Sequence, residues 1–229
     1  MAEKQYELCL EILRRFRREK LLGNLVLIGS WCLIFYEDYF QSGKAVNAAA
    51  LKTRDIDFLV PSPSKIVHKI DIPALFEDLG FVVTIGGSNG LIRLNHPDLI
   101  LEFLVPERGR GQDKPVNLPQ LGMNATALRS LNFLTENVIH VKVEDFHILV
   151  PHPVNFSLHK LIVAQRRSNK DKSIKDRQMG IRLLNDLIKK GDGGLIRRIF
   201  DAAPTKWRKE IVKGLDPLEN RQVLTLLQN

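Results

Sequence analysis

An apolar run near the N-terminus, NLVLIGSWCLIF, is interrupted by Gly29 and Ser30. Leu25–Ile28 predicts a short buried strand, and the small pair after it predicts a turn into a helix from Ser30 onward. A helix start offers unpaired backbone N–H groups with partial positive charge, which favours a phosphate. Glycine lets a phosphate approach the backbone closely, and Ser30 can cap the helix and donate its hydroxyl. A Gly-Ser pair by itself, however, is more often a simple helix cap.

Two aspartates lie inside the next apolar segment, TRDIDFLV. Because side chains alternate along a strand, Asp55 and Asp57 face one side, and Ile56 and Phe58 face the other. Two neighbouring carboxylates repel each other and cost stability unless a cation lies between them. Mg²⁺ prefers oxygen ligands, commonly one or two carboxylates together with substrate phosphates. The pair therefore predicts a metal site, although a lone Asp-x-Asp is often a turn or a solvated edge.

A third carboxylate, Glu102, is the one charged residue within the apolar segment Leu99–Val105, which also predicts a strand. Three acids at the ends of neighbouring strands would bind two Mg²⁺ (or Mn²⁺) ions. Such ions activate an attacking oxygen and stabilise a leaving pyrophosphate. The Gly-Ser turn, the paired acids and the single acid together indicate this chemistry more strongly than any one of them.

The order LIGSW, TRDIDFLV, LILEFLVP resembles the nucleotidyltransferase superfamily, the fold of DNA polymerase beta and the aminoglycoside nucleotidyltransferases. The family's pattern is a hydrophobic-Gly-Ser turn, an Asp-x-Asp on the next strand and a third carboxylate on a later strand. The resemblance implies that Gly29 and Ser30 hold a nucleoside triphosphate (NTP) and that Asp55 and Asp57 bind both metals. It also implies that Glu102 holds the catalytic metal and helps to deprotonate the acceptor hydroxyl.

The later segment PHPVNFSLHKLIVAQRR is similar to the helical part of bacterial nucleotidyltransferase-like proteins of the abortive-infection type. In those proteins a lysine on the first helix after the sheet points toward the triphosphate, and a Lys-Asp pair follows. The matching positions are Lys160, and Lys175 with Asp176. The resemblance therefore adds Lys160 and Lys175 to the residues expected to bind the nucleotide.

Two features depart from the family's pattern. Ser30 and Asp55 are 25 positions apart, which is longer than usual and requires an insertion over Phe40–Lys52. Glu102 stands where an aspartate is more usual, and its longer side chain would change the metal geometry. Together these departures leave room for an inactive relative.

The remaining patterns predict a sheet flanked by helices, followed by helices alone. Helical spacing covers residues 3–22, and a helix over Ile72–Leu79 would end at Gly80. Residues 41–53 contain few bulky apolar residues and predict a loop or short insertion. From Pro153 onward the pattern is helical. Further strands are expected at Phe81–Ile85, Gly90–Leu94, Leu99–Val105, Val138–Val143 and His147–Val150, and helix breaks at 189–194 and 214–217.

The excess of positive charge is confined to the C-terminal third. Residues 1–150 contain 17 Lys and Arg against 18 Asp and Glu, whereas residues 151–229 contain 17 against 8. Such an excess favours the phosphates of a nucleotide or of a nucleic acid as partners. Solvated Lys and Arg faces of a helical region would explain it equally well. The charge changes where strands give way to helices, near Pro151-His152-Pro153, so we place a domain boundary there.

The composition is that of a globular protein, with 44% hydrophobic and 26% charged residues. Cys9 and Cys32 lie in apolar contexts and form no CxxC pair, which indicates reduced core residues. Charged residues among the first seven positions argue against a signal-peptide core, and the apolar run Leu25–Tyr36 is too short to span a membrane. We therefore expect a soluble, cytoplasmic protein with no membrane partner.

Several other residues have both a functional and a structural interpretation. Arg93, on the strand before Glu102, could face the site and touch a phosphate, or could be an ordinary edge-strand arginine. Arg54 points to the face opposite the acids, which favours a structural role. The segment Glu107–Lys114 could close over substrate, although a surface loop is the simpler interpretation. The histidines lack metal-ligand spacing and predict no zinc site, and His159 is expected to be a helix-surface or packing residue.

A basic cluster in the helical region could hold a phosphate backbone. Few aromatic residues accompany it, so stacking on the bases of a single strand is not indicated. Its members are Arg166, Arg167, Lys170, Lys172, Lys175 and Arg177.

Together these patterns predict an α+β protein, with a small mixed-sheet nucleotidyltransferase core over residues 1–150 and a basic helical domain over residues 151–229. The expected reaction transfers a nucleoside monophosphate from an NTP to a hydroxyl acceptor and releases pyrophosphate. RNA, protein or a small molecule could be the acceptor. The alternatives are an inactive nucleotide-binding regulatory module and a nucleic-acid-binding protein that uses its basic domain. Three mutually repelling acids argue against the inactive module.

Overall fold

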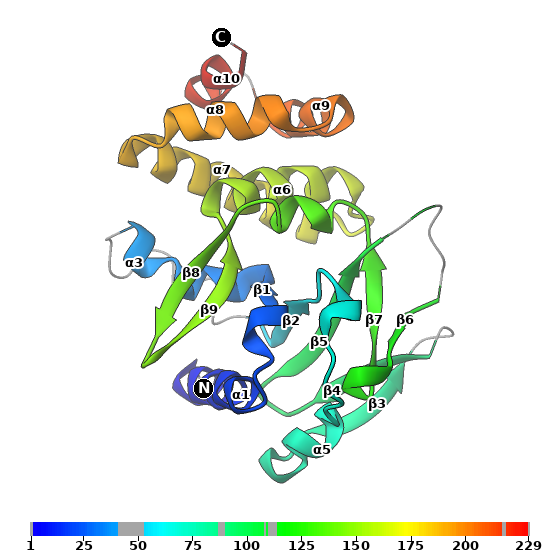
Figure 1. The fold of residues 1–229 in the computed structure, drawn as a ribbon. Helices are drawn as coiled ribbons and strands as arrows, with labels where there is room; N and C mark the ends of the chain where they lie inside the picture. Colours follow the sequence, from blue (N-terminus) through cyan, green and yellow to red (C-terminus); the bar gives the residue numbers. More distant parts are fainter. Residues whose placement is uncertain are drawn as a thin grey trace. The chain divides into compact units, whose positions relative to one another are not determined.

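The computed structural model describes residues 2–40, 53–86, 90–107, 109, 114–216 and 219–228. The chain separates into two compact units, Met1–Pro151 and His152–Asn229, which we describe one at a time (Figure 1). The expected insertion over Phe40–Lys52 lies outside the described residues except for Phe40. No helix in the described part of the chain has the length and apolar character needed to cross a membrane.

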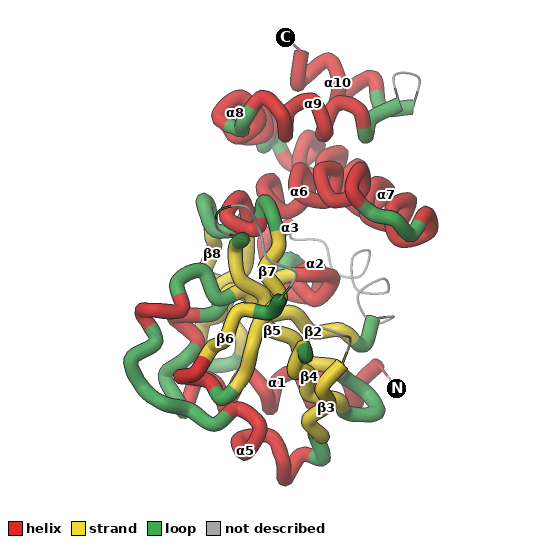
Figure 2. The backbone as a smooth tube through the Cα atoms, turned by 90° about the vertical axis from the view of Figure 1, so that its right-hand side faces the viewer, coloured by secondary structure: helices red, strands yellow, loops and turns green. Residues whose placement is uncertain are grey.

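The first unit is built on a mixed sheet, which has nine strands within the described residues. Its strands are β1 (Val26–Ile28), β2 (Asp55–Leu59), β3 (Val82–Gly86), β4 (Leu91–Asn95), β5 (Ile100–Pro106), β6 (Val116–Leu118), β7 (Met123–Leu128), β8 (Val138–Val143) and β9 (Phe146–Pro151). The order is β3-β4-β5-β2-β1-β9-β8, and β7 pairs with both β5 and β6 (Figures 1 and 2). β2 runs antiparallel to β1 but parallel to β5, so the sheet is mixed at its centre.

The helices of this unit include one long and several short ones, namely α1 (Ala2–Arg18), α2 (Cys32–Phe35), α3 (Glu37–Phe40) and α5 (Ile72–Phe76). The helix expected from Ser30 starts as a 3₁₀ turn over Gly29–Trp31 and continues as the four-residue α2. The buried Tyr36 hydroxyl donates a hydrogen bond of 2.7 Å to the carbonyl of Pro151, which ties the end of α2 to β9. The break between α2 and α3 falls at this anchor.

Aromatic rings bury one face of the central sheet. Phe16 of α1 contacts the Phe58 ring of β2 edge-on at 5.0 Å between centroids, and Phe103 of β5 lies 6.3 Å away. All three side chains are almost completely buried. Because side chains alternate along a strand, burying Phe58 and Phe103 turns Asp57 and Glu102 to the other face.

That other face is divided into an apolar part and an acidic part. Toward the ends of β2 and β5, Leu59 and Leu104 belong to a buried cluster that includes Leu131 and Leu134 of a 3₁₀ turn. Nearer the beginnings of the same strands, the face carries carboxylates in place of leucines. The acidic part of the face is thus held by a sheet that is anchored on both sides.

Most predicted elements of this unit are confirmed, with ends that shift by one or two residues, except that α1 ends at Arg18, four residues before its predicted end. Asp71 caps α5 by accepting a hydrogen bond from the Ala74 N–H, and Gly80, with φ at 85°, ends the 3₁₀ turn that follows α5. The sequence analysis missed β6 and β7. β6 is only three residues long, and the β7 sequence MNATAL has no clear apolar–polar alternation.

The second unit is helical throughout the residues described, with α6 (Pro153–Arg166), α7 (Lys170–Lys190), α8 (Gly193–Ala202), α9 (Thr205–Lys213) and α10 (Arg221–Gln228). α6 and α7 lie side by side in both views (Figures 1 and 2). Gly180 permits this approach, because a Cβ there would lie 2.7 Å from the carbonyl oxygen of Ser157. Both expected helix breaks are confirmed, as is the α+β architecture with a helical C-terminal region.

Candidate active site

Two carboxylates from neighbouring strands lie side by side on the acidic part of the sheet. β2 and β5 run parallel, and their register pairs Asp57 with Glu102. Paired positions on adjacent strands are about 4.8 Å apart at the backbone, and their side chains share one face. Both residues are half-buried. The sheet therefore forces two like charges together, which is costly unless positive charge lies close by.

The Gly-Ser turn lies directly against Asp57. Ile28, the last residue of β1, pairs with Asp57, and Gly29 follows with φ at 75°. A Cβ at Gly29 would lie 2.5 Å from Asp57 Oδ2, well inside van der Waals contact. Glycine is required here for two reasons, since the backbone is left-handed and the carboxylate occupies the space of a side chain. The predicted turn and the predicted acid thus belong to one contiguous site.

Asp55 and Ser30, the remaining residues of the predicted acid pair and Gly-Ser turn, lie at the borders of this site. Asp55 is the exposed first residue of β2 and shares a face with Asp57, and its register partner is Ile100. Ser30 follows Gly29 in the 3₁₀ turn and is half-buried. The short helix after it gives this turn little of the helix dipole that the sequence analysis expected.

The donor atoms suit a hard divalent cation, although the described residues contain no group of three or more His, Cys, Asp or Glu arranged to hold one. Asp57 and Glu102 present carboxylate oxygens from one face of adjacent strands. Mg²⁺ is commonly bound by one or two carboxylates, with water and substrate phosphates completing its shell. Asp57 and Glu102 therefore fit such an ion, and the inclusion of Asp55 stays a prediction.

Arg93 faces the same site. Its Nε lies 2.7 Å from Oε1 of Glu102, and its side chain is 43% exposed against 19% for Glu102. Of the two interpretations of this residue, the one that turns it toward the acids is the observed one. Arg54 donates a hydrogen bond of 2.8 Å to the carbonyl of His96, in agreement with its expected structural role.

In the second unit, Lys160 is held by a buried aspartate. Its Nζ lies 2.6 Å from Asp176 Oδ1, and Arg167 Nε lies 2.9 Å from Oδ2 of the same carboxylate. Asp176 is 7% exposed. Burial alone would raise the pKa of Asp176, but the charges and hydrogen bonds of Lys160 and Arg167 outweigh it and hold that pKa below its ordinary value. The Lys160 ammonium also lies 5.4 Å from the centroid of the Phe156 ring.

The remaining predicted residues of this unit have different surroundings. Lys175 is exposed on α7, next to Asp176 in sequence. His159 is 7% exposed, and burial, followed by the charges of Lys160 and Arg166, lowers its pKa to about 3. A neutral, buried histidine agrees with the packing interpretation of His159.

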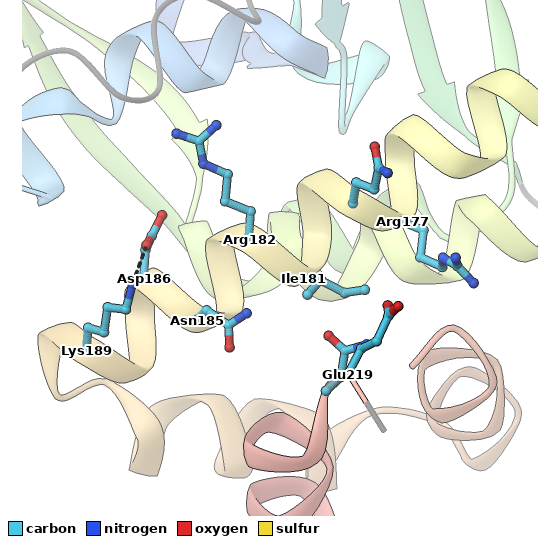
Figure 3. A pocket seen from close by; sticks show the side chains of 9 residues that line it. Arg177, Ile181, Arg182, Asn185, Asp186, Lys189 and Glu219 are labelled. Atoms are coloured by element: carbon cyan, nitrogen blue, oxygen red, sulfur yellow. Dashed lines mark ion pairs between the residues drawn. The ribbon is translucent and has the colours of Figure 1, made fainter. Parts of the chain in front are cut away.

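A polar cavity of about 480 Å³ lies between α7 and the residues just before α10 (Figure 3). Arg177 from the predicted basic cluster lines it, together with acidic and amide side chains. Lys189 and Asp186 at one end are 3.8 Å apart. The lining residues are Arg177, Gln178, Ile181, Arg182, Asn185, Asp186, Lys189, Glu219 and Asn220. The mixture of charges gives this cavity no single-sign field that would select an anion.

A family model described as nucleotidyltransferase matches residues 7–190 of the chain. The match spans the Gly-Ser turn, all three acids and the Lys160–Asp176 pair. The chain belongs to this nucleotidyltransferase family. Family membership makes it an enzyme that transfers nucleotides, as the sequence analysis predicted. No curated protein matches the sequence. The likeness to abortive-infection proteins stays a prediction.

Three solved structures resemble this nucleotidyltransferase at low identity. A nucleotidyltransferase-like antigen from Paracoccidioides brasiliensis is 14% identical, with 96% of this chain and 92% of that chain covered and a TM-score of 0.49. The solution structure of the antibiotic-resistance factor ANT(2'')-Ia is 15% identical, with 88% and 94% covered and a TM-score of 0.46. ANT(2'')-Ia in complex with adenylyl-2''-tobramycin is 15% identical, with 79% and 90% covered and a TM-score of 0.46. The family assignment depends on the family match alone.

Three contacts of this nucleotidyltransferase had no counterpart in the sequence analysis. Two are the cations on Asp176, since the sequence analysis paired Asp176 with Lys175, whereas Lys160 and Arg167 contact it. The third is the contact of Gly29 with the Asp57 carboxylate. A local pattern signals none of them, since each depends on how separate elements pack.

Proposed function

We propose that this nucleotidyltransferase moves a nucleoside monophosphate from an NTP to a hydroxyl acceptor with the help of Mg²⁺ or Mn²⁺. The observation that carries the proposal is the position of Asp57, which lies against the Gly29 turn and beside Glu102. A phosphate bound at the turn would lie next to the carboxylates that hold the ion. Triphosphate and cation would therefore share one site, as transfer of a phosphoryl group requires.

In this proposal the residues have separate tasks. The Gly29 backbone and the Ser30 hydroxyl bind the triphosphate, and Asp57 and Glu102, with Asp55, hold the cation. The ion, when bound, neutralises charge that develops on the phosphate oxygens and on the leaving pyrophosphate. Arg93 is near enough to the acids to receive a phosphate oxygen.

The reaction needs one proton transfer. The acceptor oxygen forms a bond to the α-phosphorus, the bond from that phosphorus to the bridging oxygen breaks, and pyrophosphate leaves with the bond electrons. Glu102 takes the proton of the acceptor hydroxyl. The contribution of the protein is mostly positioning and charge, because the phosphoryl transfer itself requires little covalent chemistry from side chains.

We further propose that residues 1–150 form the catalytic domain and residues 151–229 a basic helical domain that contributes Lys160 and Lys175 to nucleotide binding. The 17 Lys and Arg against 8 Asp and Glu in residues 151–229 favour an anionic acceptor, such as RNA, over a cationic one. An acceptor of this kind would give binding that weakens steeply with salt.

Thermal unfolding of wild type and of the double variant Asp55→Ala/Asp57→Ala tests the site. Each is melted with and without Mg²⁺ and with each of the four NTPs. A ligand of the folded state adds about 2.7 kcal/mol at a hundredfold excess over its Kd, so wild type should melt higher with metal and NTP together. The double variant should lose that shift. The control is Asp145→Ala, which removes an exposed carboxylate of the same unit and should keep the shift.

Turnover with an α-labelled NTP and a pool of RNA, protein and small-molecule hydroxyl compounds then identifies the acceptor. Absence of any metal-dependent shift with NTP would contradict the proposed function. A shift without any pyrophosphate release would favour an inactive nucleotide-binding module.

A further inference from the structure

Arg93 lies beside the Glu102 carboxylate. The antiparallel register of β4 and β5 pairs Leu94 with Leu101 and Asn95 with Ile100, and its continuation brings Arg93 opposite Glu102. The Arg93 Nε is 2.7 Å from Glu102 Oε1. Three neighbouring strands thus place Asp57, Glu102 and Arg93 in one row across the sheet.

This row combines two negative charges with a guanidinium. Asp57 and Glu102 are register partners and repel each other, so a positive charge beside Glu102 lowers the cost of holding them together. A divalent cation between the two carboxylates would do the same more effectively. Arg93 and the cation would then repel each other at Glu102, and the two modes of neutralisation would compete.

The ion pair between Arg93 and Glu102 has features that would allow a bound cation to replace it. Among the described residues, the buried Nε of Arg93 has no hydrogen bond of good geometry, although it lies close to Oε1 of Glu102. The contact is therefore mainly one between charges. The side chain is 43% exposed, and β3, beyond it, pairs the small, exposed Thr84 with Arg93. The Nε of Arg93 can therefore leave Glu102 without breaking a directional hydrogen bond of its own.

We propose that Arg93 is an internal counter-ion of Glu102 in the metal-free protein and that it releases Glu102 when a divalent cation binds. The released guanidinium then pairs with the NTP phosphates. This inference builds on the proposed function, since it assumes that Asp57 and Glu102 hold the cation. It makes Arg93 a positioning residue that couples metal binding to nucleotide binding.

The first experiment measures Mn²⁺ affinity without nucleotide, by calorimetry on wild type and on Arg93→Gln. Loss of the competing charge should tighten Mn²⁺ binding several-fold, up to about fivefold, because a partly exposed ion pair contributes up to about 1 kcal/mol. Arg93→Lys keeps the charge and should remain close to wild type. Arg54→Gln is the matched control, since it removes a positive charge one residue from Asp55 without touching Glu102.

Each outcome of this experiment is decisive. Equal Mn²⁺ affinity in wild type and Arg93→Gln would overturn the inference, as would an equal gain in Arg54→Gln, which would indicate a general effect of net charge. If wild type binds no Mn²⁺ and gains no stability from Mn²⁺ with NTP, the proposed function fails instead. If wild type binds Mn²⁺ and Arg93→Gln binds it with the same affinity, the proposed function stands and only the role of Arg93 is rejected.

The second experiment uses Glu102→Gln in the presence of EDTA. Neutralising Glu102 frees Arg93, so ATP should bind to this variant more tightly than to wild type under metal-free conditions. The double variant Glu102→Gln/Arg93→Gln should lose that gain. If the double variant keeps the full gain, the gain comes from the lost negative charge of Glu102 alone, and the inference that Arg93 pairs with phosphate is wrong.

Discussion

The two units of the chain surround their partly or fully buried carboxylates in opposite ways. In the first unit, Asp57 and Glu102 are register partners, so the sheet brings like charges together. In the second, Asp176 lies between Lys160 and Arg167, so the helices bring opposite charges together. A cluster of opposite charges stabilises the fold that holds it, whereas neighbouring like charges repel each other and need a compensating positive charge, such as Arg93 beside Glu102 or a bound cation.

This difference indicates where to look for function. The negative charge of Asp176 is compensated inside the second unit by Lys160 and Arg167, so removing this carboxylate should damage the fold. The charges of Asp57 and Glu102 make sense as a site for a cation, and removing one should damage activity and spare the fold. The predictions below test this contrast, starting from the largest expected effect.

Asp57→Asn should reduce turnover at least about a hundredfold, because residues that only support metal ligands already account for about ten- to a hundredfold. The melting temperature without metal should stay equal or rise, since one of two repelling charges is removed. Pyrophosphate release and thermal unfolding measure the two effects. Substantial turnover in this variant would contradict the assignment of Asp57 to the active site.

Gly29→Ala should reduce turnover about tenfold or more and lower stability. A left-handed backbone costs a non-glycine residue about 1–2 kcal/mol, and the new Cβ would push the Asp57 carboxylate away. Gly80→Ala is the matched control, because Gly80 also has positive φ but its Cβ would meet only His96, at 3.6 Å. The control should lose similar backbone stability and keep its activity. Equal loss of activity in both variants would show that backbone strain alone is responsible.

Asp176→Asn should destabilise the protein by about 2 kcal/mol, less than the loss of a fully buried pair because Arg167 is 41% exposed. Its lowered pKa means that wild type has this contribution at neutral pH and loses it as the pH falls below about 4. Urea unfolding at pH 7 and at low pH measures the difference between wild type and variant. Asp201→Asn, which breaks the exposed Arg197 pair, should cost about 0.5 kcal/mol or less.

His159 should make the protein less stable in mild acid. The unfolded chain protonates this histidine near pH 6.5, whereas the folded protein does so only near pH 3. Stability should therefore fall by about 1.4 kcal/mol per pH unit below pH 6.5, or about 2 kcal/mol by pH 5. Urea unfolding of His159→Gln should show a correspondingly smaller loss of stability between about pH 6.5 and about pH 5. His147→Gln, at an exposed position, should retain the wild-type dependence.

The sequence by itself determined most of the elements of this protein and indicated the family to which it belongs. The spacing of apolar residues predicted α1, the strands β1 to β5, the β8–β9 hairpin and the helical C-terminal unit close to their observed positions. The Gly-Ser turn and the acids Asp57 and Glu102 stood out because polar residues are rare in buried strands. These signals are local, since backbone conformation and side-chain alternation depend on neighbours along the chain.

The tertiary structure alone decided how those residues meet. The β2–β5 register put Asp57 beside Glu102, the end of β1 put Gly29 against the Asp57 carboxylate, and the β4–β5 register brought Arg93 to Glu102. The same holds for the short β6 and β7, which depend on pairing with a neighbour more than on their own pattern. Strand register and helix packing follow from the burial of residues far apart in sequence, and a local pattern carries no record of them.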